Sequence, residues 1–201
     1  RRRRHAARGA ADADRRRLTL ATIEKILGPT GMPDEMRVPL TEQIAGELEP
    51  WFEGADFRQQ LRAGEVMVKL GDRKRARRWF EKAAASATDA QIRLGDLALE
   101  DRDWADAIKW YRAATEKLPA LPLPRYLLGH ALLQTGDKEK GKKEQQRASL
   151  AALSPVARYA LAFQLKDRGL LADAAEQAKI IQSTANPTVQ HPTLAAGHLR
   201  G

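Results

Sequence analysis

The side chains that most often carry chemistry are few in this sequence and stand far apart. Cysteine is absent, which excludes a disulfide framework, a thiolate metal site and a cysteine nucleophile. None of the four histidines, His5, His130, His191 and His198, stands four residues from another, the spacing at which one helix face holds a metal ion. Phosphate-binding glycine loops and the sequence motifs of zinc proteases and serine hydrolases are also missing. We therefore expect no catalysis, no metal and no cofactor.

The length and composition bound the architecture. The chain has 201 residues, 43% hydrophobic and 30% charged, which suits one domain with a real core and an appended tail. It contains no apolar run of the roughly 18 residues that span a bilayer, and no apolar leader. Because the sequence opens with Arg1 instead of methionine, we expect a fragment of a longer protein. We expect the protein to lie in the cytoplasm, or at the cytoplasmic face of a membrane if a transmembrane segment precedes Arg1.

Most of the positive charge lies in an N-terminal arm, residues 1–17. The formal net charge is +9, and the eight arginines and two aspartates of the arm contribute +6 of it. Three interpretations are open: a solvated tail, a juxtamembrane signal led by Arg1, Arg2, Arg3 and Arg4, or a nucleic-acid contact. Aromatic residues that could stack on bases are missing from the arm, which makes nucleic acid the least favoured of the three.

A short helical segment, residues 18–56, is expected to come after the arm. Apolar residues recur at helical spacing from Leu18, and again after Pro39, where a first-turn proline is tolerated. The aromatic residues near the end of this segment are expected to seal the core of the adjoining repeat; they are Trp51, Phe52 and Phe57.

From residue 57 the chain becomes periodic, and four segments align on their central turns. They cover residues 57–83, 88–119, 122–148 and 155–181. The turn residues Gly71, Arg102, Gly136 and Gly169 are 31, 34 and 33 residues apart. Glycine suits a left-handed helix end, so Arg102 predicts a turn of different geometry. The short first interval leaves the link at residues 84–87 uncertain.

This pattern resembles the tetratricopeptide repeat, a helix-turn-helix unit of about 34 residues. The second segment matches best, with Leu94, Gly95, Ala107, Tyr111, Ala114 and Pro119 at family positions. The resemblance implies an all-α fold, an α-solenoid of antiparallel helix pairs in a right-handed superhelix over residues 57–187. Residues 188–201 then read as the truncated start of a further helix.

Small residues and turn aspartates have a physical reading of their own. Gly64, Gly95 and Gly129 each stand inside the first helix of a unit, where glycine costs about 1 kcal/mol relative to alanine. Because this cost recurs at the same position of three units, we expect a compensating gain in packing, namely the close approach of the second helix of each unit. The aspartates directly after three of the turns are expected to cap the next helix; they are Asp72, Asp103 and Asp137.

The resemblance also implies a partner-binding groove lined by the first helix of each unit. Carried over by register, the groove residues are Leu61, Glu65, Lys69, Ile92, Asp96, Glu100, Tyr126, His130, Tyr159 and Phe163. Tyr126, Tyr159 and Phe163 are expected to form an aromatic ladder there, although apolar groove residues could instead pack against neighbouring helices. His130 is equally consistent with a ligand contact and with a satisfied surface histidine.

Two basic clusters open the second helices of the first and third units. With the arm, they define a basic patch that includes Arg73, Arg75, Arg78, Lys138 and Lys142. A solvated face is the favoured reading, and contact with an acidic protein, RNA or anionic lipid is the alternative. The sequence as a whole favours a non-catalytic scaffold that binds a protein or peptide, as a monomer or within a larger complex. An electrostatic tether at a membrane or nucleic acid, and the regulatory extension of a longer enzyme, are the competing hypotheses.

Overall fold

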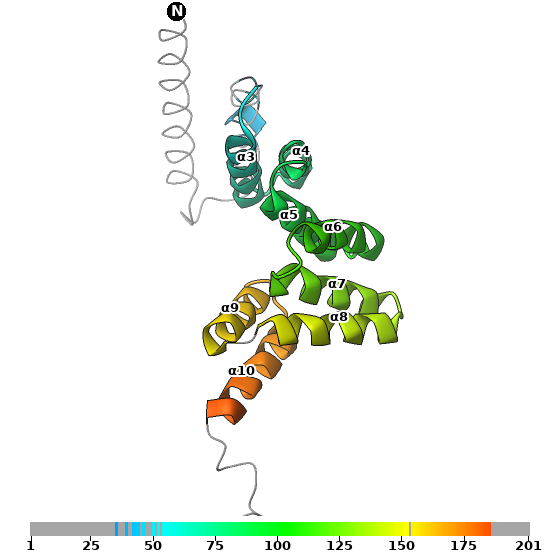
Figure 1. Ribbon diagram of the computed structural model, residues 1–201. Helices are drawn as coiled ribbons and strands as arrows, with labels where there is room; N and C mark the ends of the chain where they lie inside the picture. The colour runs from blue at the N-terminus through cyan, green and yellow to red at the C-terminus, as the bar shows by residue number, and fades with distance from the viewer. Residues whose placement is uncertain are drawn as a thin grey trace, which may run out of the picture. The chain divides into compact units, whose positions relative to one another are not determined.

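The computed structural model is all-helical where the chain is described. The described residues are 35, 39, 42–44, 46, 50, 52, 54–152 and 154–185, and no strand occurs among them (Figure 1). Their helices are α3 (Phe57–Leu70), α4 (Arg73–Ala84), α5 (Thr88–Glu100), α6 (Trp104–Lys117), α7 (Pro122–Gln134), α8 (Lys138–Ala151), α9 (Pro155–Lys166) and α10 (Leu171–Ala185). The predictions for the basic arm, for residues 18–34 and for residues 188–201 lie outside the described residues.

The four predicted segments coincide with four consecutive helix pairs. Each segment begins within a residue of a helix start, and each central turn joins the two helices of a pair. The pairs α3–α4, α7–α8 and α9–α10 pack side by side around their short turns, which makes them antiparallel. The prediction of an all-α fold of antiparallel helix pairs is therefore confirmed.

All four central turns share one left-handed geometry, and the expectation of a different turn at Arg102 is wrong. Arg102 has φ 58°, beside φ 80°, 88° and 74° at Gly71, Gly136 and Gly169. The residue after Arg102 donates its N–H to the carbonyl of Ala98 at 2.8 Å, and the other three turns make the same five-residue return bond. The helices on both sides impose the turn, and an arginine bears a conformational cost that glycine avoids.

The turn aspartates cap the second helix of the first three pairs, as predicted. The carboxylate oxygens of Asp72 and Asp103 accept from the backbone N–H groups of Arg75 and Asp106, at 2.9 and 3.1 Å. Asp137 caps α8 in the same way. The uncertain link after α4 is a tight turn, in which the carbonyl of Ala83 accepts from Ser86 and Ala87. Helix α4 has 12 residues against 14 in α6, which accounts for most of the short interval.

The chain divides within α5 into two compact units, Arg1–Leu97 and Ala98–Gly201. In the first unit Phe52, 1% exposed, packs edge-on against Trp79 with ring centroids 5.2 Å apart, which confirms its predicted role in the core. Phe57 is 38% exposed and does not join that core; Trp51 is outside the described residues. A hydrogen bond from Arg73 to the carbonyl of Leu97 (2.8 Å) ties α4 to α5.

Helix α7 is the central element of the second unit, because it packs against α6, α8 and α9. Its sequence is apolar on nearly every side, as a helix with neighbours around it requires. Eight of its residues are buried, and they are Leu123, Pro124, Tyr126, Leu127, Leu128, Gly129, Ala131 and Leu132.

Glycine residues, which have no side chain, let the two helices of a pair approach closely. A Cβ on Gly64 would run into the ring of Phe80, and one on Gly129 would lie 2.7 Å from the carbonyl oxygen of Gly141 on α8. A Cβ on Gly141 would in turn lie 2.7 Å from Leu133 Cγ. The predicted close approach is thus confirmed for the first and third pairs.

Gly129→Ala should lower the free energy of unfolding by about 1–3 kcal/mol, because overpacking outweighs the gain of about 1 kcal/mol from helix propensity. Chemical denaturation monitored by circular dichroism measures the change. The matched control is Gly46→Ala, at an exposed helical position with nothing within 4 Å, which should be neutral or stabilising. Equal effects at the two glycines would contradict the close packing of α7 and α8.

Arg102→Gly should raise the free energy of unfolding by about 1 kcal/mol, because glycine adopts the left-handed turn without the cost borne by a Cβ. The reciprocal change, Gly136→Ala, should lower it by a similar amount, since that site is open and only the backbone conformation opposes the new side chain. Thermal melts of both variants beside the parent protein test the pair. A stabilised Gly136→Ala variant would refute the common turn geometry.

Candidate functional site

In the first unit the two acidic positions of the predicted groove, Glu65 and Asp96, are already paired. Arg93 Nη2 of α5 lies 3.0 Å from Glu65 Oε1 of α3, and its other terminal nitrogen lies 4.0 Å from Asp96. Leu61 is half-buried, and Ile92 is 5% exposed. The expectation that Ile92 is open to a partner is wrong, because its side chain belongs to the core. This part of the predicted groove is therefore a polar surface whose acids are paired with Arg93. Two further groove residues are exposed, Lys69 in the first unit and Glu100 in the second.

The predicted aromatic ladder is broken at its first member. Tyr126 is 2% exposed, and its hydroxyl donates to Asp173 Oδ1 of α10 at 3.0 Å. The expectation that Tyr126 stands on an open surface is wrong, because α10 covers this part of α7. Sequence register could not reveal this contact, since the two residues are 47 positions apart and no motif links them.

Asp173 joins Tyr126 and His130 into one polar cluster. His130 Nδ1 lies 3.4 Å from Asp173 Oδ2, so each carboxylate oxygen has a partner. Hydrogen bonding from His130, and then from Tyr126, holds the pKa of Asp173 below its ordinary value despite partial burial. Burial and the adjacent carboxylate raise the pKa of Tyr126. His130 is thus a satisfied, half-buried histidine that anchors α7 to α10.

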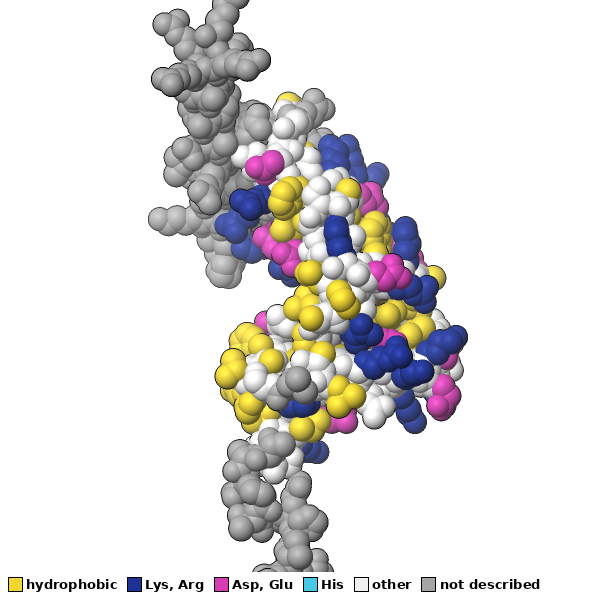
Figure 2. Space-filling view, viewed as in Figure 1, with side chains coloured by type: hydrophobic (Ala, Val, Ile, Leu, Met, Phe, Trp, Pro, Cys, Tyr) yellow, Lys and Arg dark blue, Asp and Glu magenta, His cyan; other side chains and the backbone are white. Residues whose placement is uncertain are grey.

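Helix α9 presents three exposed apolar side chains. Val156, Tyr159 and Phe163 are 79%, 66% and 56% exposed. They recur at i, i+3 and i+7, so they share one side of the helix, which we name the α9 apolar face. In Figure 2 hydrophobic side chains gather where Figure 1 draws α9. Two of the three ladder residues therefore do stand together in the open, with Val156 as an addition.

Local sequence and one half-buried arginine position this face. Ser154 caps α9 by accepting from the N–H of Ala157 at 3.0 Å, and Pro155 occupies the first turn. Leu161 and Leu165, 1% and 0% exposed, hold the opposite side of the helix in the core. Arg158 donates to the carbonyl of Ser149 at 3.0 Å and to Gln177 at 3.1 Å, which ties α9 to both α8 and α10.

The described members of the predicted basic patch differ in their exposure. On α4, Arg73 and Arg75 are half-buried and bound to Leu97 and Asp72, whereas Arg78 is exposed. On α8, Lys138 and Lys142 are exposed. Arg1, Arg2, Arg3 and Arg4 lie outside the described residues.

The described residues contain no cluster of His, Asp and Glu that could hold a metal ion. Within the same residues, no helix has both the length and the apolar character of a membrane span.

Comparisons with known proteins agree with the repeat architecture. Residues 124–152, most of α7 and α8, match the tetratricopeptide repeat family model. A solved structure of MamA from Desulfovibrio magneticus RS-1 is similar over 84% of this chain and 96% of its own, with 22% identity and a TM-score of 0.52. A double mutant of RS-1 MamA is similar over 84% of this chain and 95% of its own, with 21% identity and a TM-score of 0.52. A further MamA crystal structure is similar over 79% of this chain and 96% of its own, with 14% identity and a TM-score of 0.52. None of the curated proteins matches in sequence. At these identities the structures establish the fold alone.

Asp173→Asn should lower the free energy of unfolding by about 1–3 kcal/mol at pH 7, the range for hydrogen bonds to a charged group. Because the pKa of Asp173 is depressed in the folded protein, its contribution is present above the ordinary aspartate value of 3.8 and is lost as pH falls through the folded-state pKa. The difference between variant and parent should therefore shrink on acidification. Denaturation curves from pH 7 to about pH 2 measure it, with Asp167→Asn, an exposed carboxylate, as the control. A difference that stays constant with pH would contradict this role.

Proposed function

We propose that this chain, which has the tetratricopeptide-repeat fold, is a non-catalytic scaffold that binds a segment of a partner protein on the α9 apolar face. The observation that carries the proposal is the exposure of Val156, Tyr159 and Phe163 on one side of one helix. Monomeric proteins seldom leave several large apolar side chains together in water without a use for them.

The energetics favour recognition at this face. Covering three side chains that are more than half exposed would contribute roughly 3–6 kcal/mol before the costs of association. Tyr159 and Phe163 are aromatic, and aromatic anchors dominate the binding energy of many interfaces. The helix itself is rigidly held through Leu161, Leu165 and Arg158, so a partner would pay little to order it.

The preferred partner is an apolar segment. Val156, Tyr159 and Phe163 of the α9 apolar face carry no charge, so the face itself does not favour a charged residue in the bound segment. Specificity would then come from the shape of the apolar anchors.

Replacing Tyr159 and Phe163 together by serine should weaken binding at least tenfold, because hot-spot aromatics typically contribute about 2 kcal/mol or more. The ligand for this test is a peptide selected from a random library against the full chain and then synthesised. Its dissociation constants for parent and variant are measured by fluorescence anisotropy. The melting temperature should hardly change, because both residues are exposed.

The matched control is Leu161→Ala with Leu165→Ala, on the buried side of the same helix. These truncations should cost about 2–5 kcal/mol of stability each. If the serine variant proves as unstable as this control, the α9 apolar face is core. If it is stable and still binds the selected peptide normally, the binding surface lies elsewhere.

A further inference from the structure

We propose that the outer side of α8 is a second interaction surface, which binds an acidic segment of a partner protein. The surface, named here the α8 lysine face, consists of Lys138, Lys142 and Lys143, with Leu150 near its end. All four side chains are exposed. This inference rests on α8 alone and does not depend on the α9 apolar face.

Helix α8 has an unusually narrow buried side. Of its 14 residues, only Gly141 and Ala148 are buried. The close approach of Gly141 to Gly129 and Leu133 seats the helix on α7 with little side-chain material. Most of its circumference is therefore left to face water, and that part is rich in lysine.

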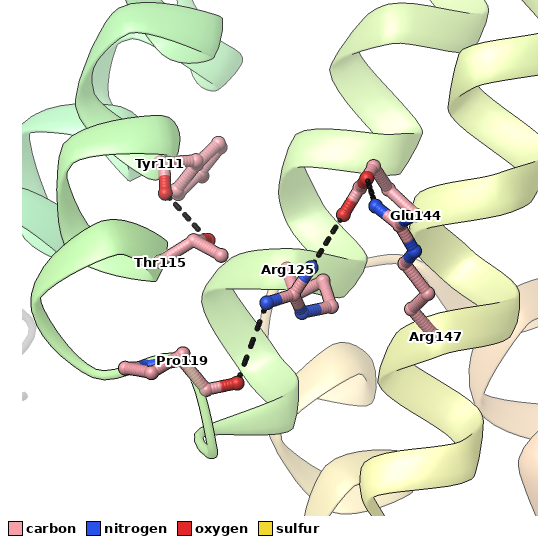
Figure 3. Close-up of polar contacts among 6 residues, drawn as sticks. All are labelled: Tyr111, Thr115, Pro119, Arg125, Glu144 and Arg147. Atoms are coloured by element: carbon pink, nitrogen blue, oxygen red, sulfur yellow. Dashed lines mark hydrogen bonds and ion pairs between the residues drawn. The ribbon is translucent and has the colours of Figure 1, made fainter.

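Two of the three acids near these lysines, Glu144 and Asp137, are bound to other cations. Both carboxylate oxygens of Glu144 are occupied, by Arg125 Nη1 at 2.8 Å and by Arg147 Nη1 at 2.7 Å (Figure 3). Arg125 also reaches the carbonyl of Pro119, so this carboxylate belongs to a structural tie between α8 and the α6–α7 link. Asp137 is occupied by Lys140 at 2.8 Å.

What remains is a positive surface with a specific layout. Lys142 and Lys143 are consecutive, so their side chains leave the helix about 100° apart, on either side of a seam that contains Gln146 and Leu150. Leu150 is 63% exposed. A segment lying along this seam could place carboxylates against both lysines and an apolar side chain against Leu150.

The composition favours an acidic protein over nucleic acid or a membrane. Helix α8 contains no aromatic residue on which a base could stack. Glu139, in the first turn of α8, is exposed among the lysines of this face. It would repel a continuous array of phosphates, whereas a peptide can place its separate carboxylates away from it. One exposed leucine is too little apolar surface for insertion into an interface.

The experiment compares two charge-reversed variants of the 201-residue chain with the parent. Lys142→Glu with Lys143→Glu alters the proposed face, whereas Arg112→Glu with Lys179→Glu makes the same charge change at exposed residues of two other helices, α6 and α10. The identical net charge of the two variants cancels any contribution from the basic arm. The probe is a fluorescein-labelled glutamate–leucine peptide, and anisotropy at low salt gives its affinity.

We expect the α8 variant to bind the peptide about tenfold more weakly than the control variant, with a smaller dependence on salt. Leu150→Ser should weaken binding of this peptide but not of a glutamate–serine version. Equal affinities of the two reversed proteins would overturn the proposal, because binding would then depend on net charge alone. Tighter, Lys142- and Lys143-dependent binding of single-stranded RNA or phosphatidylserine vesicles would also overturn it and assign the face to phosphate. Circular dichroism verifies that both variants are folded.

Discussion

In the first and third helix pairs, contact between the two helices depends on glycine positions, which have no side chain. Gly64 leaves room for the ring of Phe80, and Gly129 leaves room for the backbone of α8 at Gly141. These glycines are costly inside a helix, and the cost is offset by the packing that they allow. The short turns then have one geometry open to them, and that geometry holds even where the turn residue is Arg102.

The same constraint shapes the surfaces available for binding. On α8, the small residue Gly141 carries the contact with α7, so the rest of the helix can be polar without loss of core. On α9, larger residues do this work: Leu161 and Leu165 fill the core, and Arg158 ties the helix to its neighbours. Two helices of one unit thereby offer chemically opposite faces, one basic and one apolar, on a scaffold that does not have to move to present them.

Polar contacts in the second unit serve the packing of the helices. Glu144 is shared between Arg125 and Arg147, and Asp173 between Tyr126 and His130. In each case a carboxylate of one helix binds a side chain of another helix that the repeat pattern does not relate to it. These ties fix how successive helices stack, which local helix propensity leaves undetermined.

The repeat period, the start of each helix pair, the capping aspartates and the close approach at Gly64 and Gly129 could be predicted from the sequence, because each is a local property of the chain or of one helix pair. It could not decide which members of an equivalent set are covered. Tyr126 and Tyr159 hold the same place in successive repeats, yet Tyr126 is 2% exposed and Tyr159 is 66% exposed. The difference comes from α10, because its Asp173 accepts a hydrogen bond from the hydroxyl of Tyr126. Within the described residues, no helix covers Tyr159 to a comparable extent. Exposure depends on what is stacked over a helix, and only the tertiary structure supplies that neighbour.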